Sequence, residues 1–268
     1  MLKTRVKTGA VLTVLAGVIL LLSRFAWVLP AAGAALCLMG VYELTRATGF
    51  LKNKWDFALT AVVTVLLNMV RIPYYSVLTA VCLAAALGIS LWLMDRVGKQ
   101  SRVPSFAARV LALVMPVFFR AMAELRLLEH GMYLLLLTFL LGAVTDMAAY
   151  FVGRLLGKHP LAPTLSPHKT REGSIGGVLG TVALLTPLTA ILMMDASMHW
   201  GRLILFLAVG SLVGQFGDLA MSAVKRIVGI KDFSRLLPGH GGILDRMDST
   251  MFILPFSYLF YICFPWIG

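Results

Sequence analysis

Two aspartates three residues apart, Asp245 and Asp248, stand at the start of a predicted helix near the end of the chain. Residues spaced i, i+3 lie on the same side of a helix, so the two carboxylates repel one another unless a cation lies near them. Mg²⁺ suits such a pair, because it takes one or two protein carboxylates and completes its shell with phosphate oxygens and water. The pair therefore predicts a magnesium site that handles a phosphate-bearing ligand. The alternative is that both carboxylates only stabilise the positive end of the helix.

Two further aspartates, Asp146 and Asp218, lie inside apolar segments, where an unpaired carboxylate costs about 2.5–3.5 kcal/mol. Asp218 shares a helical face with Ser222 and Lys225, and Asp146 shares one with glycines and a tyrosine. Small residues on these faces allow neighbouring helices to approach closely. The spacing predicts that two helices each present a carboxylate to a site. The alternative is a structural aspartate paired with a Lys or Arg.

The loop before Asp245 combines a glycine turn with several basic residues. His240, Gly241 and Gly242 form a flexible turn whose amides could approach a phosphate closely. The basic residues of this loop are Lys225, Arg226, Lys231 and Arg235. Such a cluster indicates either a phosphate clamp or the usual excess of positive charge on cytoplasmic loops.

A second polar loop, residues 154–172, contains a segment that only superficially resembles a P-loop. Three residues instead of four separate Gly153 from Gly157, and His159 follows Lys158 where a P-loop requires Ser or Thr. The sequence therefore excludes a P-loop NTPase.

The same loop ends in Lys169 and Thr170, followed by a glycine-rich turn that opens an apolar segment. The glycines of the turn include Gly173, Gly176 and Gly177. A helix N-terminus preceded by glycines readily binds anions, which favours a phosphate site. The alternative is that Gly176 and Gly177 serve helix entry and tight interhelical packing.

Composition indicates that these groups work at a membrane. Of the 268 residues, 59% are hydrophobic and only 13% are charged, and the mean hydropathy is +0.88, which excludes a soluble enzyme. Cys37, Cys82 and Cys263 are far apart and lie among apolar residues, so we expect neither a disulfide nor a thiolate metal site. Stretches with few or no charges predict nine membrane spans, at residues 8–23, 25–42, 56–70, 72–94, 103–119, 131–153, 173–194, 203–224 and 249–267.

Basic residues predict the orientation of these spans. With a cytoplasmic N-terminus, 19 of the 24 Lys and Arg residues fall in inside segments, so the positive-inside rule predicts that the C-terminus is outside. Both long polar loops, 154–172 and 225–248, then face the cytoplasm. We expect an all-α polytopic membrane protein in which residues 1–268 form a single domain, with N-terminal spans at 1–130 and a catalytic half at 131–268. The net charge of +12 is spread between the spans, which favours anionic lipid or nucleotide over nucleic acid as the partner.

The segment from Ser222 to Asp248 resembles the signature of the phosphatidate cytidylyltransferases, or CDP-diacylglycerol synthases. The positions that carry the resemblance are Ser222, Lys225, Arg226, Lys231, Asp232, Pro238, His240, Gly241, Gly242, Asp245, Arg246 and Asp248. An upstream run also resembles this family, through Asp146, Tyr150, Gly153, Arg154, Gly157, Lys158, His159, Ser166, Pro167, Lys169, Thr170, Glu172, Gly173, Gly176 and Gly177. Together the two segments cover about the last 120 residues.

The resemblance implies the reaction of CTP with phosphatidate to give CDP-diacylglycerol and pyrophosphate, with Mg²⁺ as the cofactor. It implies that Asp218, Asp245 and Asp248 hold the metal and that Lys225 joins them in catalysis. The substrate-binding residues that it implies are Lys158, Ser166, Lys169, Thr170, Gly173, Gly176, Gly177, Ser222, Arg226, Lys231, Asp232, His240, Gly241, Gly242 and Arg246. Which loop binds CTP and which binds the lipid phosphate stays open.

The compact chain is similar to the bacterial members of that family, which implies a multi-pass protein of the inner membrane, and a homo-oligomer is possible. Two other classes remain as alternatives. In a transporter, Asp146 and Asp218 would be proton or cation sites. A polyprenol kinase would share the metal and phosphate chemistry but would transfer the γ-phosphoryl group of CTP.

Overall fold

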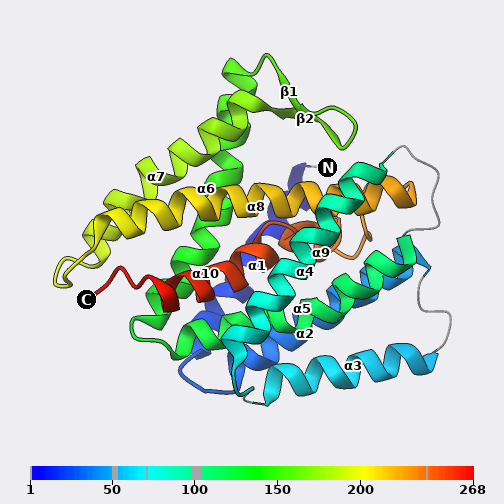
Figure 1. The fold of residues 1–268 in the computed structure, drawn as a ribbon, viewed down its shortest axis with the longest axis horizontal. Coiled ribbons are helices and arrows are strands. Elements are labelled where there is room, and N and C mark those ends of the chain that lie inside the picture. The colour runs from blue at the N-terminus through cyan, green and yellow to red at the C-terminus, as the bar shows by residue number, and fades with distance from the viewer. Residues whose placement is uncertain (1, 50–53, 71, 98–103, 240) are drawn as a thin grey trace.

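The computed structural model describes residues 2–49, 54–70, 72–97, 104–239 and 241–268, and this part of the chain is mostly helical. Its elements are α1 (Leu2–Leu22), α2 (Val28–Thr48), α3 (Lys54–Met69), α4 (Tyr75–Arg96), α5 (Pro104–Leu127), α6 (Gly131–Leu156), β1 (Pro160–Ala162), β2 (Ser166–Thr170), α7 (Arg171–Leu192), α8 (Trp200–Val228), α9 (Leu244–Met247) and α10 (Thr250–Cys263). Figure 1 shows the helices packed along one another, with the small hairpin at the end where α6 leads into α7.

Each of the nine predicted apolar segments contains one long helix in the described part of the chain. Five of these helices, α2, α4, α6, α7 and α8, are long and apolar enough to cross a membrane. The helices α3 and α10 are shorter, with 16 and 14 residues, and α5 carries Arg109, Arg120 and Glu124. The mostly helical class and the presence of several apolar helices long enough to cross a membrane are therefore confirmed, whereas nine crossings and their orientation stay predictions.

The hairpin β1–β2 differs from the all-α prediction. Its strands are antiparallel, with Pro160 paired to Thr170 and Ala162 paired to Ser166. Between them the Leu165 side chain is buried, and its carbonyl accepts a hydrogen bond of 3.1 Å from Nε of Arg226 on α8. The 154–172 loop thus folds back over α8. The strand pairing and the hydrogen bond between Arg226 and Leu165 together hold it there.

The most extensive interhelical contact joins α6 and α7, which run side by side (Figure 1). A Cβ atom at Gly176 would lie 2.5 Å from the Val152 side chain, and one at Gly173 would lie 2.8 Å from the Ala149 carbonyl oxygen. Glycine is therefore required for the two backbones to approach this closely. This contact confirms the packing interpretation of Gly176, and Gly177 is buried in the same interface.

The two halves of the chain share one packed interior. The helix α5 packs against α2, α3 and α4 from the first half, and α10 packs against α4 and α5 as well as against α6 and α8. Phe118 on α5 and Phe252 on α10 meet edge to face, with ring centroids 5.8 Å apart. The N-terminal helices therefore contribute directly to positioning the elements that carry the site.

Candidate active site

A cavity of about 340 Å³, here called the first cavity, lies between α6, the hairpin, α7 and α8. Its apolar part comes from α6 and the hairpin, and its polar lining mixes acids with bases. The polar residues that line it are Asp146, Tyr150, Arg154, His168, Lys169, Thr170, Ser174, Gln215 and Asp218. Two of the four predicted aspartates and one predicted lysine thus meet in one place.

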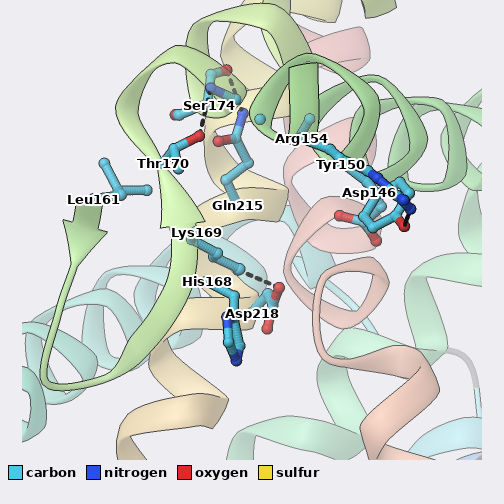
Figure 2. Close-up of a pocket in the computed structure, with 13 residues that line it drawn as sticks. Asp146, Tyr150, Arg154, Leu161, His168, Lys169, Thr170, Ser174, Gln215 and Asp218 are labelled. Carbon is cyan, nitrogen blue, oxygen red and sulfur yellow. Dashed lines mark hydrogen bonds and ion pairs between the residues drawn. The ribbon is translucent and has the colours of Figure 1, made fainter. Parts of the chain in front are cut away.

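Lys169 and Asp218 form the central ion pair of the first cavity. Figure 2 shows the Lys169 side chain reaching from β2 to the Asp218 carboxylate on α8. Both side chains are partly exposed, which leaves them accessible to a ligand. Ser222 Oγ lies 3.5 Å from the other Asp218 oxygen, as expected for residues one helical turn apart. Sequence analysis placed Asp218 on a face with Lys225, yet the cation that reaches it comes from the hairpin.

Tyr150, Arg154 and Asp146 enter the first cavity from α6, opposite Lys169 and Asp218 (Figure 2). The Arg154 guanidinium donates to the Tyr150 hydroxyl over 2.9 Å, which orients the guanidinium along the helix. Asp146 is exposed to the cavity and interacts electrostatically with Asp218 and Lys169. The cavity therefore presents cations and carboxylates at short range, an arrangement that suits phosphate groups and their counterions.

Asp248 lies beside Asp218, although it does not line the first cavity. Its carbonyl oxygen sits 2.8 Å from the position that a Cβ atom of Gly217 would occupy. Burial raises the pKa of Asp248 to about 7, and the neighbouring Asp218 carboxylate adds to the shift. The side chain accepts a hydrogen bond of 2.9 Å from the Ser249 amide. Asp248 and Asp218 thus form a pair of carboxylates that repel one another.

Asp245 has different neighbours from Asp248. It is 8% exposed and accepts hydrogen bonds from Lys225 Nζ at 2.9 Å, the Phe233 amide at 2.9 Å and the Gly242 amide at 3.0 Å. Lys225 also lies over the Phe233 ring, 5.4 Å from its centroid. Asp245 therefore organises the 229–243 loop, and Lys225 neutralises Asp245.

The three predicted metal ligands are consequently not brought together as one group. Among the described residues, no cluster of three or more His, Cys, Asp or Glu side chains is arranged to hold a metal ion. The Asp218 and Asp248 carboxylates do interact, and Asp146 is the next acid to both. Joint metal binding by Asp245 and Asp248 stays a prediction, and the contacts of Asp245 weigh against it.

Glu43 on α2 is a residue of this region that sequence analysis missed. It is 1% exposed and accepts hydrogen bonds from Ser234 Oγ at 2.6 Å, the Ile243 amide at 3.0 Å and the Leu244 amide at 2.8 Å. The second predicted span stopped at residue 42, so Glu43 was not counted among the acids in apolar segments. Its position one residue beyond the span was the available signal.

Several predicted substrate-binding residues have structural contacts. Thr170 caps α7 by accepting a hydrogen bond of 3.1 Å from the Gly173 amide. Glu172 accepts from the Lys158 and His159 amides and pairs with the His159 ring over 2.6 Å. The Lys158 side chain is exposed. These contacts hold the end of α6 against the start of α7.

The remaining predicted residues lie on both sides of the 229–243 loop. Lys231 and Asp232 are exposed and line a separate cavity, and Arg246 is exposed and lies within electrostatic range of Asp146. Gly241 has φ +81°, a conformation that favours glycine, and faces the Asp245 carboxylate. His240 lies outside the described residues.

Comparison with known proteins supports the resemblance found in the sequence. The cytidylyltransferase family matches residues 3–264. Phosphatidate cytidylyltransferase of Staphylococcus epidermidis is 49% identical over 127 residues, and those of Staphylococcus saprophyticus and Staphylococcus aureus are 46% identical over 127 residues. Each alignment covers 47% of this chain, and it spans about half the length, 48%, of the relative. The chain belongs to the cytidylyltransferase family.

Proposed function

We propose that this protein is a phosphatidate cytidylyltransferase, which converts CTP and phosphatidate to CDP-diacylglycerol and pyrophosphate at the cytoplasmic face of a membrane. The observation that carries the proposal is the Lys169–Asp218 ion pair in the first cavity, next to Asp146 and with Asp248 close by. Membership of the family and the names of the relatives support it. The apolar helices around the cavity fit a substrate that stays in the bilayer.

In the proposed reaction, a phosphate oxygen of phosphatidate attacks the α-phosphorus of CTP. A new P–O bond forms, the bond from the α-phosphorus to the bridging oxygen of the β-phosphate breaks, and pyrophosphate leaves with that electron pair. The nucleophile is already an anion, so no covalent enzyme intermediate is needed. The protein has to orient two polyanions and neutralise the charge that develops between them.

Lys169 and Arg154 are the cations that the first cavity offers for this work. Lys169 is held in place by Asp218, so its ammonium group is positioned before substrate arrives. Arg154 lies on the wall opposite Lys169, where the Tyr150 hydroxyl orients it. Because charge-assisted contacts to phosphate are about twice as strong as neutral ones, these two side chains are the strongest candidates for binding the triphosphate or the lipid phosphate.

We further propose Mg²⁺ as the cofactor, held by Asp218 and Asp248. The carboxylate chemistry fits, because Mg²⁺ commonly takes one or two protein carboxylates together with phosphates and water. The repulsion between Asp218 and Asp248 also fits, since a cation between them would relieve it. When bound, the ion would neutralise the triphosphate. Asp245 is the weaker candidate, because Lys225 and two amides already occupy its oxygens.

Placement in the membrane is part of the proposal. Nine crossings with a cytoplasmic N-terminus would put the hairpin and the 229–243 loop on the cytoplasmic side, where CTP is available. The positive-inside distribution of Lys and Arg supports this orientation. The relatives are bacterial proteins, which supports a bacterial cell membrane as the location.

Purified protein in detergent with Mg²⁺, phosphatidate and CTP labelled at the α-phosphorus tests the activity. We expect label in the lipid product. A lipid kinase would transfer the γ-phosphoryl group and leave the label in CDP. The absence of turnover would favour a transporter.

The same assay tests the role of Lys169. Lys169→Gln should lower turnover by about 10- to 100-fold, because a charge-assisted phosphate contact contributes roughly 1.5–3 kcal/mol. Arg171→Gln is the matched control, since Arg171 is exposed two residues further along and does not line the first cavity. Equal losses in both variants would remove Lys169 from the site.

A further inference from the structure

A second and larger cavity, of about 1020 Å³, lies between the last turns of α2 and residues 230–236. We call it the α2 groove, and it is lined by Met39, Tyr42, Glu43, Arg46, Ala47 and Ile230–Leu236. It shares no lining residue with the first cavity. The family resemblance implies substrate binding for two of its lining residues, Lys231 and Asp232, and implies no role for the residues that α2 contributes.

The α2 wall of the groove changes from apolar to basic toward the end of the helix. Met39, Tyr42 and Arg46 are spaced i, i+3, i+7, so they lie along one face over about 10 Å. Met39 is 42% exposed and Tyr42 is 48% exposed, on a helix that is long and apolar enough to span a membrane. Arg46 is exposed in the last turn and donates to the Tyr42 hydroxyl over 3.3 Å.

The opposite wall, residues 230–236, adds two cations that no nearby carboxylate neutralises among the described residues. Lys231 and Arg235 are both exposed, and neither has an ion-pair partner within the part of the chain that the structure describes. Glu43 is committed to three hydrogen bonds from the loop, which leaves Asp232 as the available carboxylate of the groove. Leu236, 56% exposed, places an apolar side chain beside Arg235.

We propose that the α2 groove binds an anionic membrane phospholipid. Arg46 and Arg235 would hold the headgroup phosphate, and the acyl chains would follow Met39 and Leu236 toward the hydrocarbon. The basic end of the groove favours a negatively charged headgroup, and its apolar wall favours acyl chains. A soluble anion would not need the apolar wall. The site goes beyond the proposed reaction and depends on it only for the placement of this end of α2 at the cytoplasmic membrane surface.

Lipid in the groove would act on the 229–243 loop. Phe233, in the groove wall, donates its amide to Asp245, and Ser234 donates its hydroxyl to Glu43. Asp245 in turn holds Lys225. A phospholipid that braces residues 230–236 would therefore stabilise the arrangement of Asp245 and Lys225.

Native mass spectrometry of the purified full chain in neutral detergent tests the binding, with phosphatidylglycerol and phosphatidylcholine as probes. The wild-type protein should bind phosphatidylglycerol more tightly than phosphatidylcholine. The double variant Arg46→Gln/Arg235→Gln should lose affinity for phosphatidylglycerol by about tenfold or more. The control Arg96→Gln/Arg171→Gln removes the same charge outside the groove and should bind as the wild type does.

Two further variants separate binding from misfolding. Arg46→Lys/Arg235→Lys keeps both charges and should retain preference for phosphatidylglycerol, whereas Leu236→Glu adds a negative charge to the groove and should lower that affinity. Equal binding of both lipids by the wild type, or unchanged affinity in the Gln double variant, would overturn the proposal. Cytidylyl transfer with phosphatidate in detergent is measured separately, so a failure of lipid binding is distinguishable from a failure of the proposed reaction.

Discussion

Asp245 and Asp248 lie three residues apart but have different electrostatic surroundings, although Lys225 interacts with both. Asp245 faces one ammonium group and two amides, all within 3.0 Å. Asp248 faces the Asp218 carboxylate and accepts only from the Ser249 amide among the hydrogen bonds of the described residues. Removing one partner of a buried ion pair typically costs about 3–5 kcal/mol, whereas removing one of two repelling charges relieves strain. The two carboxylates should therefore respond differently to the same substitution.

Asp245→Asn should lower the melting temperature in detergent, because Lys225 then lacks its counterion. Asp248→Asn should leave the melting temperature unchanged or raise it, since repulsion with Asp218 disappears. In the CTP-dependent assay both variants should lose activity by about tenfold or more, the rate equivalent of 1.4 kcal/mol. Identical melting temperatures for the two variants would contradict the different roles of Asp245, which holds the 229–243 loop, and Asp248, which belongs to the proposed site.

At the scale of elements, the contact between α6 and α7 decides where the first cavity lies. Thr145 on α6 and Thr181 on α7 hydrogen-bond through their hydroxyls over 2.8 Å, inside an interface made of small residues. Gln215 Nε2 on α8 donates to the Ser174 carbonyl oxygen over 3.2 Å, which ties α7 to the helix that carries Asp218. Hydrogen bonds and close backbone packing replace the hydrophobic effect as the forces between helices in lipid.

Gly180→Ala tests this packing, because the added Cβ would lie 2.6 Å from the Ala148 Cβ on α6. Overpacking of this kind costs roughly 1–3 kcal/mol, so the melting temperature should fall. The double variant Ala148→Gly/Gly180→Ala exchanges the two side chains and should recover most of the loss. Gly88→Ala on α4 is the matched control, since nothing lies within 4 Å of the added atom. A melting temperature of Gly180→Ala equal to that of the control would count against close packing.

At the scale of the whole molecule, Glu43 connects the N-terminal half to the site. Its three hydrogen bonds run from α2 to residues about 190–200 positions later in the chain. A Cβ at Gly242 would overlap the Glu43 carboxylate, so the turn fits closely around this side chain. The N-terminal helices thus shape the 229–243 loop.

Glu43→Ala should release that loop. Hydrogen exchange at the Ile243 and Leu244 amides should become faster, and turnover should fall because Asp245 and Asp248 follow directly in sequence. Glu129→Ala is the control, because the Glu129 side chain is 88% exposed and pairs only weakly with His130 at 4.0 Å. Unchanged exchange at residues 243 and 244 would mean that Glu43 does not hold the loop in solution.

The proposed orientation of the whole molecule is tested by cysteine labelling. In a background with Cys37, Cys82 and Cys263 replaced by alanine, a cysteine at position 235 should react with an impermeant reagent only after the cells are opened. A cysteine at position 268 should react in sealed cells. Labelling of position 235 from outside would refute a cytoplasmic 229–243 loop.

The sequence by itself determined the helical class, the position of each long helix and the family. An apolar stretch of about 20 residues is the length of a helix that crosses a bilayer. The position and length of each long helix therefore depend on the local sequence. The residue types and spacing around Asp218, Lys169 and Asp248 also predict phosphate and metal chemistry, and this stays a prediction.

Which charged groups meet was decided only by the tertiary structure. The partner of Asp218 is Lys169, 49 positions away, and the partner of Lys225 is Asp245 instead of the helical neighbour Asp218. The hairpin arises from pairing between short strands that have no periodic signal, and Glu43 reaches a loop some 200 residues further along the chain. Ion pairs and hydrogen bonds act over a few ångströms, so their partners depend on how the helices pack, and sequence spacing carries that information only within one helix.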